Sequence, residues 1–147
     1  MKNLIALLLL VTQFSFAQEK NAVSWSASFK SLSATEGEIM ISAKIEKGWH
    51  TYSQRPTDAG PVPTSFSFEP SPNYSLNGKT EESNAHEEFV KAFDAKIFIF
   101  SDKAEFKQKI RISGKPGFKI NFKVENMCCN DMMCLPPKIT DLSVIAK

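Results

Sequence analysis

Apolar and polar residues alternate with a period of two over much of this chain. In Glu38–Ile45, for example, every second residue is isoleucine or alanine. Such alternation is typical of strands that have one face covered by a core. The same pattern predicts further strands at Val23–Phe29, Trp49–Ser53, Ser65–Glu69, Lys96–Phe100, Ala104–Ile112, Phe118–Val124 and Leu142–Ala146.

Residues that favour turns separate these segments. Glycine and proline cluster in residues 59–63 and 114–117, and Asn77-Gly78 marks another turn. The segment Thr80–Ala92 has few apolar positions, so it predicts a loop with room for one helical turn. About eight closely spaced strands in one domain of about 130 residues predict an all-β fold, an immunoglobulin-like antiparallel β-sandwich.

The first residues have the composition of an export signal. Lys2 precedes the apolar run Leu4–Val11, and small residues at Ser15 and Ala17 mark a cleavage site. The run is too short to span a bilayer, which takes about 20 residues. We therefore expect residues 1–17 to be a signal peptide cleaved after Ala17. Residues 18–147 would be one periplasmic domain with no direct membrane span.

Charge and cysteine content narrow the class of function. The chain has 18 basic and 16 acidic residues, and its net charge of +2 argues against nucleic acid or an anionic membrane as main partner. Export takes the protein to conditions in which disulfides persist. Since there are three cysteines, at least one lies outside any intramolecular bridge.

The three cysteines lie within seven residues, at positions 128, 129 and 134. We expect them on a loop between strands Phe118–Met127 and Ile139–Ala146, because prolines 136 and 137 should stop regular pairing. Across such a hairpin, both Cys129–Cys134 and Cys128–Cys134 bridges are possible. A bridge between adjacent Cys128 and Cys129 would be strained.

Three kinds of chemistry fit this segment. The first is a structural disulfide, although closing a loop of about six residues stabilises a fold by only about 2 kcal/mol. The second is redox exchange, since closely spaced cysteines on an exposed tip are accessible to partners. The third is Cu(I) binding, because Met127, Met132 and Met133 add soft thioether ligands to the thiols. Spacing alone slightly favours the structural bridge.

Three motifs together resemble a known family. The segments CNDMMCLPP, GWHTYSQ and GPVPTSFSFE are similar to the N-terminal periplasmic domain of the transmembrane disulfide reductase DsbD, over about Val23 to Ala146. The resemblance implies an immunoglobulin-like sandwich, which agrees with the strand count. It also implies that one cysteine pair shuttles two electrons, with no cofactor and no metal. The implied partners are thioredoxin-fold envelope proteins: a disulfide isomerase, thioredoxin-like proteins of cytochrome c maturation, and a membrane reductase.

The resemblance also suggests roles for the cysteines. The family pair, with four intervening residues, matches Cys129 and Cys134. Cys134 would form the mixed disulfide with partners, and Cys129 would resolve it. Some family members have five intervening residues, and that spacing would select Cys128 instead of Cys129.

Aromatic residues on a strand beside the family's pair match Trp49, His50 and Tyr52 of this chain. His50 and Tyr52 are two apart, so they share one face of a strand. Where this chain has His50, the family commonly has tyrosine. An imidazole near a thiol lowers the thiol pKa by favouring the thiolate. The alternative is that His50 is a half-buried strand residue with no chemical role.

The family also shields its cysteines with a cap loop, in which a phenylalanine follows acidic residues. The matching stretch is Glu87–Ala95, where Phe93 aligns best by its distance from the next strand and Phe89 is the alternative. The loop is longer here than in the family. We interpret Glu87 and Glu88 as a solvated charge pair rather than as proton carriers.

The leading hypothesis is a thiol–disulfide interchange module of a protein-disulfide reductase system. Either separate proteins supply its reductant, or the chain is a relic or regulator with a similar fold. Two alternatives remain open at this point. One is a Cu(I)-binding or copper-delivery protein. The other is a non-catalytic β-sandwich interaction module with a structural disulfide.

Overall fold

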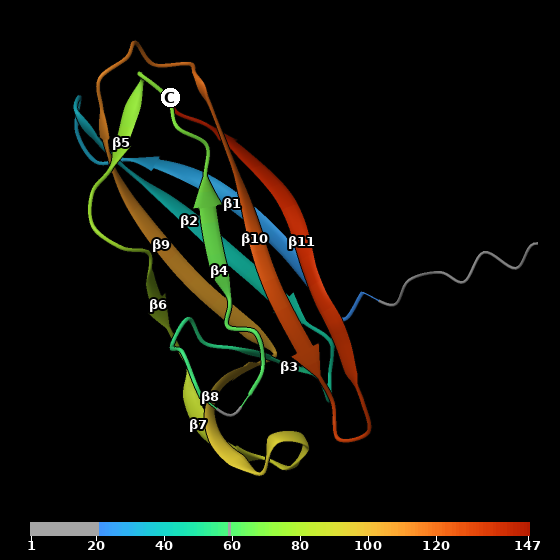
Figure 1. Cartoon of the computed structure of the whole chain (residues 1–147). Coiled ribbons are helices and arrows are strands. Elements are labelled where there is room, and N and C mark those ends of the chain that lie inside the picture. The colour runs from blue at the N-terminus through green and yellow to red at the C-terminus, as the bar shows by residue number, and fades with distance from the viewer. Residues whose placement is uncertain (1–20, 59) are drawn as a thin grey trace, which may run out of the picture.

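A computed structural model describes residues 21–58 and 60–147 of the chain, and it shows two antiparallel sheets packed face to face (Figure 1). The first sheet contains β1 (Val23–Ser31), β2 (Glu36–Ile45), β9 (Lys103–Ile112), β5 (Tyr74–Leu76) and β6 (Glu81–Ser83). The second contains β11 (Cys134–Ile145), β10 (Lys119–Cys129), β3 (His50–Tyr52), β8 (Ala95–Ser101), β7 (His86–Val90) and β4 (Ser65–Phe68). A turn of 3₁₀ helix, η1 (Lys91–Phe93), joins β7 to β8. The prediction of an all-β, immunoglobulin-like antiparallel sandwich is confirmed.

The main core lies between the two sheets. Strand β2 alternates as its sequence predicts, and Ile39 and Ile41 are completely buried. From the opposite sheet, Phe100 packs edge-on against Phe106 with ring centroids 5.2 Å apart. Phe66 reaches Phe106 in the same way at 4.9 Å. Burial of these apolar faces on both sheets is the main contribution to the stability of the fold.

The interpretation of Thr80–Ala92 as a loop is wrong for most of its length. The segment contains β6, which pairs with β9, and β7, which pairs with β8, while η1 begins at its end. Most of β7 is exposed, so its side chains carry no apolar alternation. Its backbone hydrogen bonds to β8 form this edge strand without a buried face, and a sequence pattern cannot reveal that.

Pairing also continues through the prolines, contrary to expectation. Strand β11 begins at Cys134 and includes Pro136 and Pro137. The register shifts between Asn126 and Cys128 of β10, where two steps along β10 face three along β11. This β-bulge and the edge position of β11 accommodate two residues without a backbone N–H. The hairpin strands therefore extend to the cysteines themselves.

The described part of the chain has no helix long and apolar enough to cross a membrane. The predicted signal peptide, with its cleavage site after Ala17, lies outside the described residues. The β7–β8 hairpin and the tip of the β10–β11 hairpin lie at the same end of the sandwich (Figure 1). That end contains the cysteine segment.

Candidate functional site

A disulfide joins Cys129, the last residue of β10, to Cys134, the first residue of β11. The two cysteines are directly opposite one another in the strand register, with Cα atoms 4.0 Å apart. Cys129 is completely buried, whereas Cys134 is partly exposed. A reagent that approaches from solvent therefore meets the sulfur of Cys134 first.

The loop between the cysteines is held by Asn130. Its side-chain Oδ1 accepts hydrogen bonds from the backbone N–H groups of Met132 (2.9 Å) and Met133 (2.8 Å). Its own N–H donates to the carbonyl oxygen of Met133 at 2.9 Å. This use of an asparagine side chain is common in turns, so Asn130 directly after a strand is a sequence signal for this turn. The loop leaves the Met132 side chain 91% exposed.

Cys128 faces away from the disulfide. Successive side chains of a strand point to opposite faces, so Cys128 enters the main core while Cys129 enters a second, smaller cluster. Burial raises the pKa of the Cys128 thiol, and the nearby Glu46 carboxylate raises it further. The third thiol is thus buried and favoured in its neutral form, on the face opposite to Cys134.

This division was readable in the sequence. Ile120 and Phe122 of β10 are buried in the main core, and Val124 is completely buried. Cys128 continues their alternation. A regular strand that ends at Val124 or Met127, as predicted from the sequence, leaves the cysteines outside this alternation. Extending it places Cys128 on the core face and Cys129 on the other.

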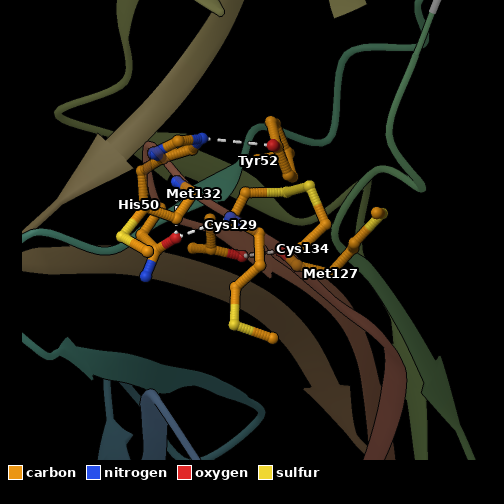
Figure 2. Close-up of a disulfide and its surroundings, with 9 residues drawn as sticks. His50, Tyr52, Met127, Cys129, Met132 and Cys134 are labelled. Carbon is orange, nitrogen blue, oxygen red and sulfur yellow. Dashed lines mark hydrogen bonds between the residues drawn. A yellow bond between two sulfur atoms is a disulfide. The ribbon is translucent and has the colours of Figure 1, made fainter. Parts of the chain in front are cut away.

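His50, Cys129 and Cys134 form a row across three neighbouring strands. His50 of β3 is the register partner of Cys129, which is in turn the partner of Cys134. Side chains of directly paired residues lie on the same face of a sheet. The His50 Nε2 and the Tyr52 hydroxyl are 3.1 Å apart and form a hydrogen bond, with the two rings edge to face (Figure 2).

Burial controls the charge of both aromatic residues. It lowers the pKa of His50, although the carboxylates of Glu88 and Asp131 act in the opposite direction. The His50 imidazole is therefore mostly neutral at pH 7. Burial also raises the pKa of the Tyr52 hydroxyl, so that Tyr52 remains a proton-bearing hydrogen-bond donor at any physiological pH.

The smaller cluster covers the disulfide with apolar side chains. Tyr52, Cys129, Val90, Ile97 and Ile99 are buried in it, and Phe93, Ala95, Met127 and Cys134 pack against it. The Phe93 ring meets Tyr52 edge to face, with centroids 6.1 Å apart. Of the two candidate cap residues, Phe93 therefore belongs to this cluster. Trp49, expected beside the pair, is buried in the main core instead.

A groove of about 540 Å³ opens beside the partly exposed Cys134. Phe89, the other candidate cap residue, lines it and is 53% exposed. His50 and the two carboxylate residues Glu88 and Asp131 also line it. The groove gives a partner access to Cys134, while Cys129 remains covered.

The described residues contain no group of three or more histidine, cysteine or acidic side chains that could hold a metal ion. The disulfide itself is the chemical group that this arrangement presents to the groove. One sulfur is accessible, the other is buried as a leaving group, and an imidazole–phenol pair lies alongside.

Comparison with known proteins agrees with this chemistry. Residues 15–145 match the family described as "Thiol:disulfide interchange protein DsbD, N-terminal". The chain belongs to this family. It is accordingly a thiol–disulfide interchange module by family, as the resemblance in its motifs implied. No curated protein sequence matches the chain significantly.

Solved structures of DsbD N-terminal domains share the fold. The reduced domain from Neisseria meningitidis has a TM-score of 0.51 and 13% identity, over 82% of this chain and 85% of that one. The same domain in a complex with the PilB N-terminal domain, from the same organism, has a TM-score of 0.52 and 12% identity, over 88% and 87%. The N-terminal periplasmic domain of ScsB from Proteus mirabilis has a TM-score of 0.54 and 18% identity, over 82% and 44%.

Proposed function

We propose that this DsbD N-terminal family domain passes two electrons through the Cys129–Cys134 pair, between thioredoxin-fold partners in the periplasm. The observation that carries the proposal is the unequal exposure of the two sulfurs. Cys134 is open to a groove, and Cys129 is completely buried behind it. A structural staple has no need of such an opening, whereas exchange requires one attackable sulfur.

The proposed reduction has two steps. A partner thiolate attacks the Sγ of Cys134, the disulfide breaks, and the Sγ of Cys129 leaves as a thiolate. A second partner thiolate then attacks the partner's sulfur in the mixed disulfide and releases Cys134. In the opposite direction, the Cys134 thiolate attacks a partner disulfide, and Cys129 resolves the mixed disulfide to restore the bridge.

The partner class is part of the proposal. A DsbD N-terminal domain has been solved in a complex with a PilB N-terminal domain, which shows that a relative binds another protein domain. For this chain, we propose a membrane reductase as electron donor, with a disulfide isomerase or thioredoxin-like proteins of cytochrome c maturation as acceptors. We also propose that the working domain is residues 18–147, released by cleavage after Ala17.

A trapping experiment in the native envelope tests the proposal. The variant Cys129→Ser cannot resolve a mixed disulfide, so partners should accumulate on Cys134 and be identified by mass spectrometry. The matched control is Cys128→Ser, which keeps the disulfide and should trap nothing. A Cys129→Ser trap that contains no thioredoxin-fold protein would contradict the proposed exchange.

Two measurements in vitro separate the alternatives. Equilibration with glutathione or dithiothreitol gives the reduction potential, and a value far below about −300 mV would indicate a structural bridge. Titration of the reduced protein with Cu(I) against a competing chelator tests the copper hypothesis. Tight binding at one ion per domain would favour it over exchange.

A further inference from the structure

The leaving group of the proposed reduction is buried. When a reductant attacks Cys134, the electron pair of the broken bond remains on the sulfur of Cys129, whose side chain is completely buried. A thiolate there is costly, because a charge in an apolar cluster lacks hydration. Water has no direct access to the Cys129 sulfur, so its proton has to arrive through the protein.

We propose that His50 and Tyr52 form a relay that delivers a proton from the groove to the sulfur of Cys129 during reduction, and returns it during oxidation. This inference rests on the proposed exchange function and adds a proton path to it. Within the relay, His50 is a positioning and proton-transfer residue that acts through Tyr52.

The outer link of the relay is a hydrogen bond, and its inner end lies in the cluster that buries Cys129. His50 lines the groove, so one side of its ring is open to solvent. Its Nε2 is hydrogen-bonded to the hydroxyl of Tyr52 at 3.1 Å. Tyr52 is only 1% exposed and belongs to the same buried cluster as Cys129. Figure 2 shows the Tyr52 hydroxyl on the same side of the disulfide as the His50 ring.

The register keeps the members of the relay on one face. His50 pairs with Cys129 across β3 and β10, and Tyr52 is on the same face two residues along β3. Thr51 between them faces the opposite way, where it donates a hydrogen bond to the carbonyl oxygen of Met127 at 2.8 Å. That bond ties β3 to β10 and holds the row in place.

Several titratable groups surround the open end of the relay. Glu88 and His86 lie on β7, and Asp131 lies on the hairpin loop. Lys91 of η1 lines the same groove. Because burial lowers the pKa of His50 from its ordinary value, the ring is mostly neutral at pH 7. A neutral imidazole carries one N–H and one free nitrogen, and proton transfer through the ring needs both.

The transfer balances in atoms and electrons. A reducing dithiol supplies the electron pair and becomes a disulfide, and the pair leaves on the Sγ of Cys129. The Tyr52 O–H gives its proton to that sulfur, and the Tyr52 oxygen takes the proton of the His50 Nε2–H. The Nδ1 of His50 then takes a proton from water in the groove. The reverse sequence removes the thiol proton when the pair is oxidised.

The test is the reduction rate of the full-length mature protein with dithiothreitol between pH 5.5 and 8.5. Each rate is divided by the concentration of dithiothreitol thiolate, and each is measured in H₂O and in D₂O. Tyr52→Phe and His50→Gln should each lower the normalised rate by about 100-fold, the lower end for general acid catalysis. The normalised wild-type rate should fall as the pH falls through the pKa of His50, because the protonated ring has no free nitrogen to take up a proton, and this fall should be absent in His50→Gln.

The chain supplies a matched control, because it has two histidines. His86 lies on β7 near His50 but bonds to Glu88 rather than to Tyr52, with 3.3 Å between Nε2 and Oε2. His86→Gln should keep the normalised rate within about twofold of wild type. It should also keep the solvent isotope effect that both relay variants lose. A purely structural role of Tyr52 would change the unfolding midpoint and leave the isotope effect intact.

Wild-type-like rates and isotope effects in both relay variants would overturn the relay. If neither variant folds, a wild-type isotope effect near 1 would overturn it equally. These kinetics use a small reagent, so they report on the relay even if the envelope trap finds no partner. Conversely, a trap rich in thioredoxin-fold proteins with no isotope effect would preserve the exchange function and exclude the relay.

Discussion

At the scale of single residues, two adjacent cysteines have opposite environments. Cys128 is 6% exposed in the main core, and Cys129 is bonded to Cys134 in the smaller cluster. The same backbone alternation separates them, and it prevents Cys128 from reaching the disulfide without a slip of β10 by one residue. The third thiol therefore contributes to packing rather than to the redox pair.

The raised pKa of Cys128 predicts how the stability of the fold depends on pH. Its pKa is raised from the ordinary value of 9.0, so its contribution to folding is complete below pH 9 and is lost as the pH rises through the folded-state pKa. Cys128→Ala should lower the free energy of unfolding at pH 7 by about 1 kcal/mol, through lost packing. It should also remove part of the stability loss above pH 9. Urea unfolding at pH 7, 9 and 10 checks both effects, and an unchanged alkaline loss would contradict the assignment.

At the scale of elements, the β7–η1–β8 segment acts as a cover for the disulfide. It reaches the site through Val90, Ile97, Ile99 and Phe93, which surround Tyr52 and Cys129. The outer side of β7 is polar and exposed, so the segment is held by its pairing with β8 and by these few apolar contacts. Few buried contacts imply a low local stability for this cover.

Phe93 and Phe89 give a paired test of this cover. Phe93→Ala should lower the free energy of unfolding by about 1–3 kcal/mol and increase the rate at which iodoacetamide alkylates the reduced cysteines. Phe89→Ala, in which the lost ring is 53% exposed, should change stability by less than about 0.5 kcal/mol. Equal alkylation rates in the two variants would show that Phe93 does not shield the pair.

At the scale of the whole molecule, the redox site and the main core are separate. The main core draws on both sheets and includes Ile39, Phe100 and Phe106, whereas Cys129 and Cys134 belong to the second cluster. Breaking the disulfide therefore opens no cavity in the main core. The fold can hold either redox state on the same scaffold, as the proposed exchange function requires.

We expect the reduced protein to remain folded. The disulfide spans a sequence separation of 5, and closing so short a loop stabilises the fold by only about 2 kcal/mol. Unfolding in urea should be cooperative both with and without dithiothreitol. The midpoint should be lower when dithiothreitol is present. A reduced protein that lacks a cooperative transition would show that the bridge is structural. The Cys128→Ala background serves as control against disulfide reshuffling.

The sequence predicted the fold class well, because strand alternation is a local property. Val23–Phe29 and Ala104–Ile112 lie within observed strands with little change of boundary. It failed at β7, whose exposed side chains leave no pattern, and at Pro136, where a bulge lets pairing continue. Both failures involve edge strands, in which backbone pairing rather than side-chain burial makes the strand.

By itself, the sequence determined the sandwich and the family, through apolar alternation and through the motifs around the cysteines. It also contained the phase that separates Cys128 from Cys129, since a period of two continues from Phe122 to Cys128. Only the tertiary structure decided what covers Cys129 and which residue lies beside it. The neighbours His50 and Phe93 come from segments distant from the cysteines in sequence, and the pairing of β3 with β10 is a long-range choice that no local pattern encodes.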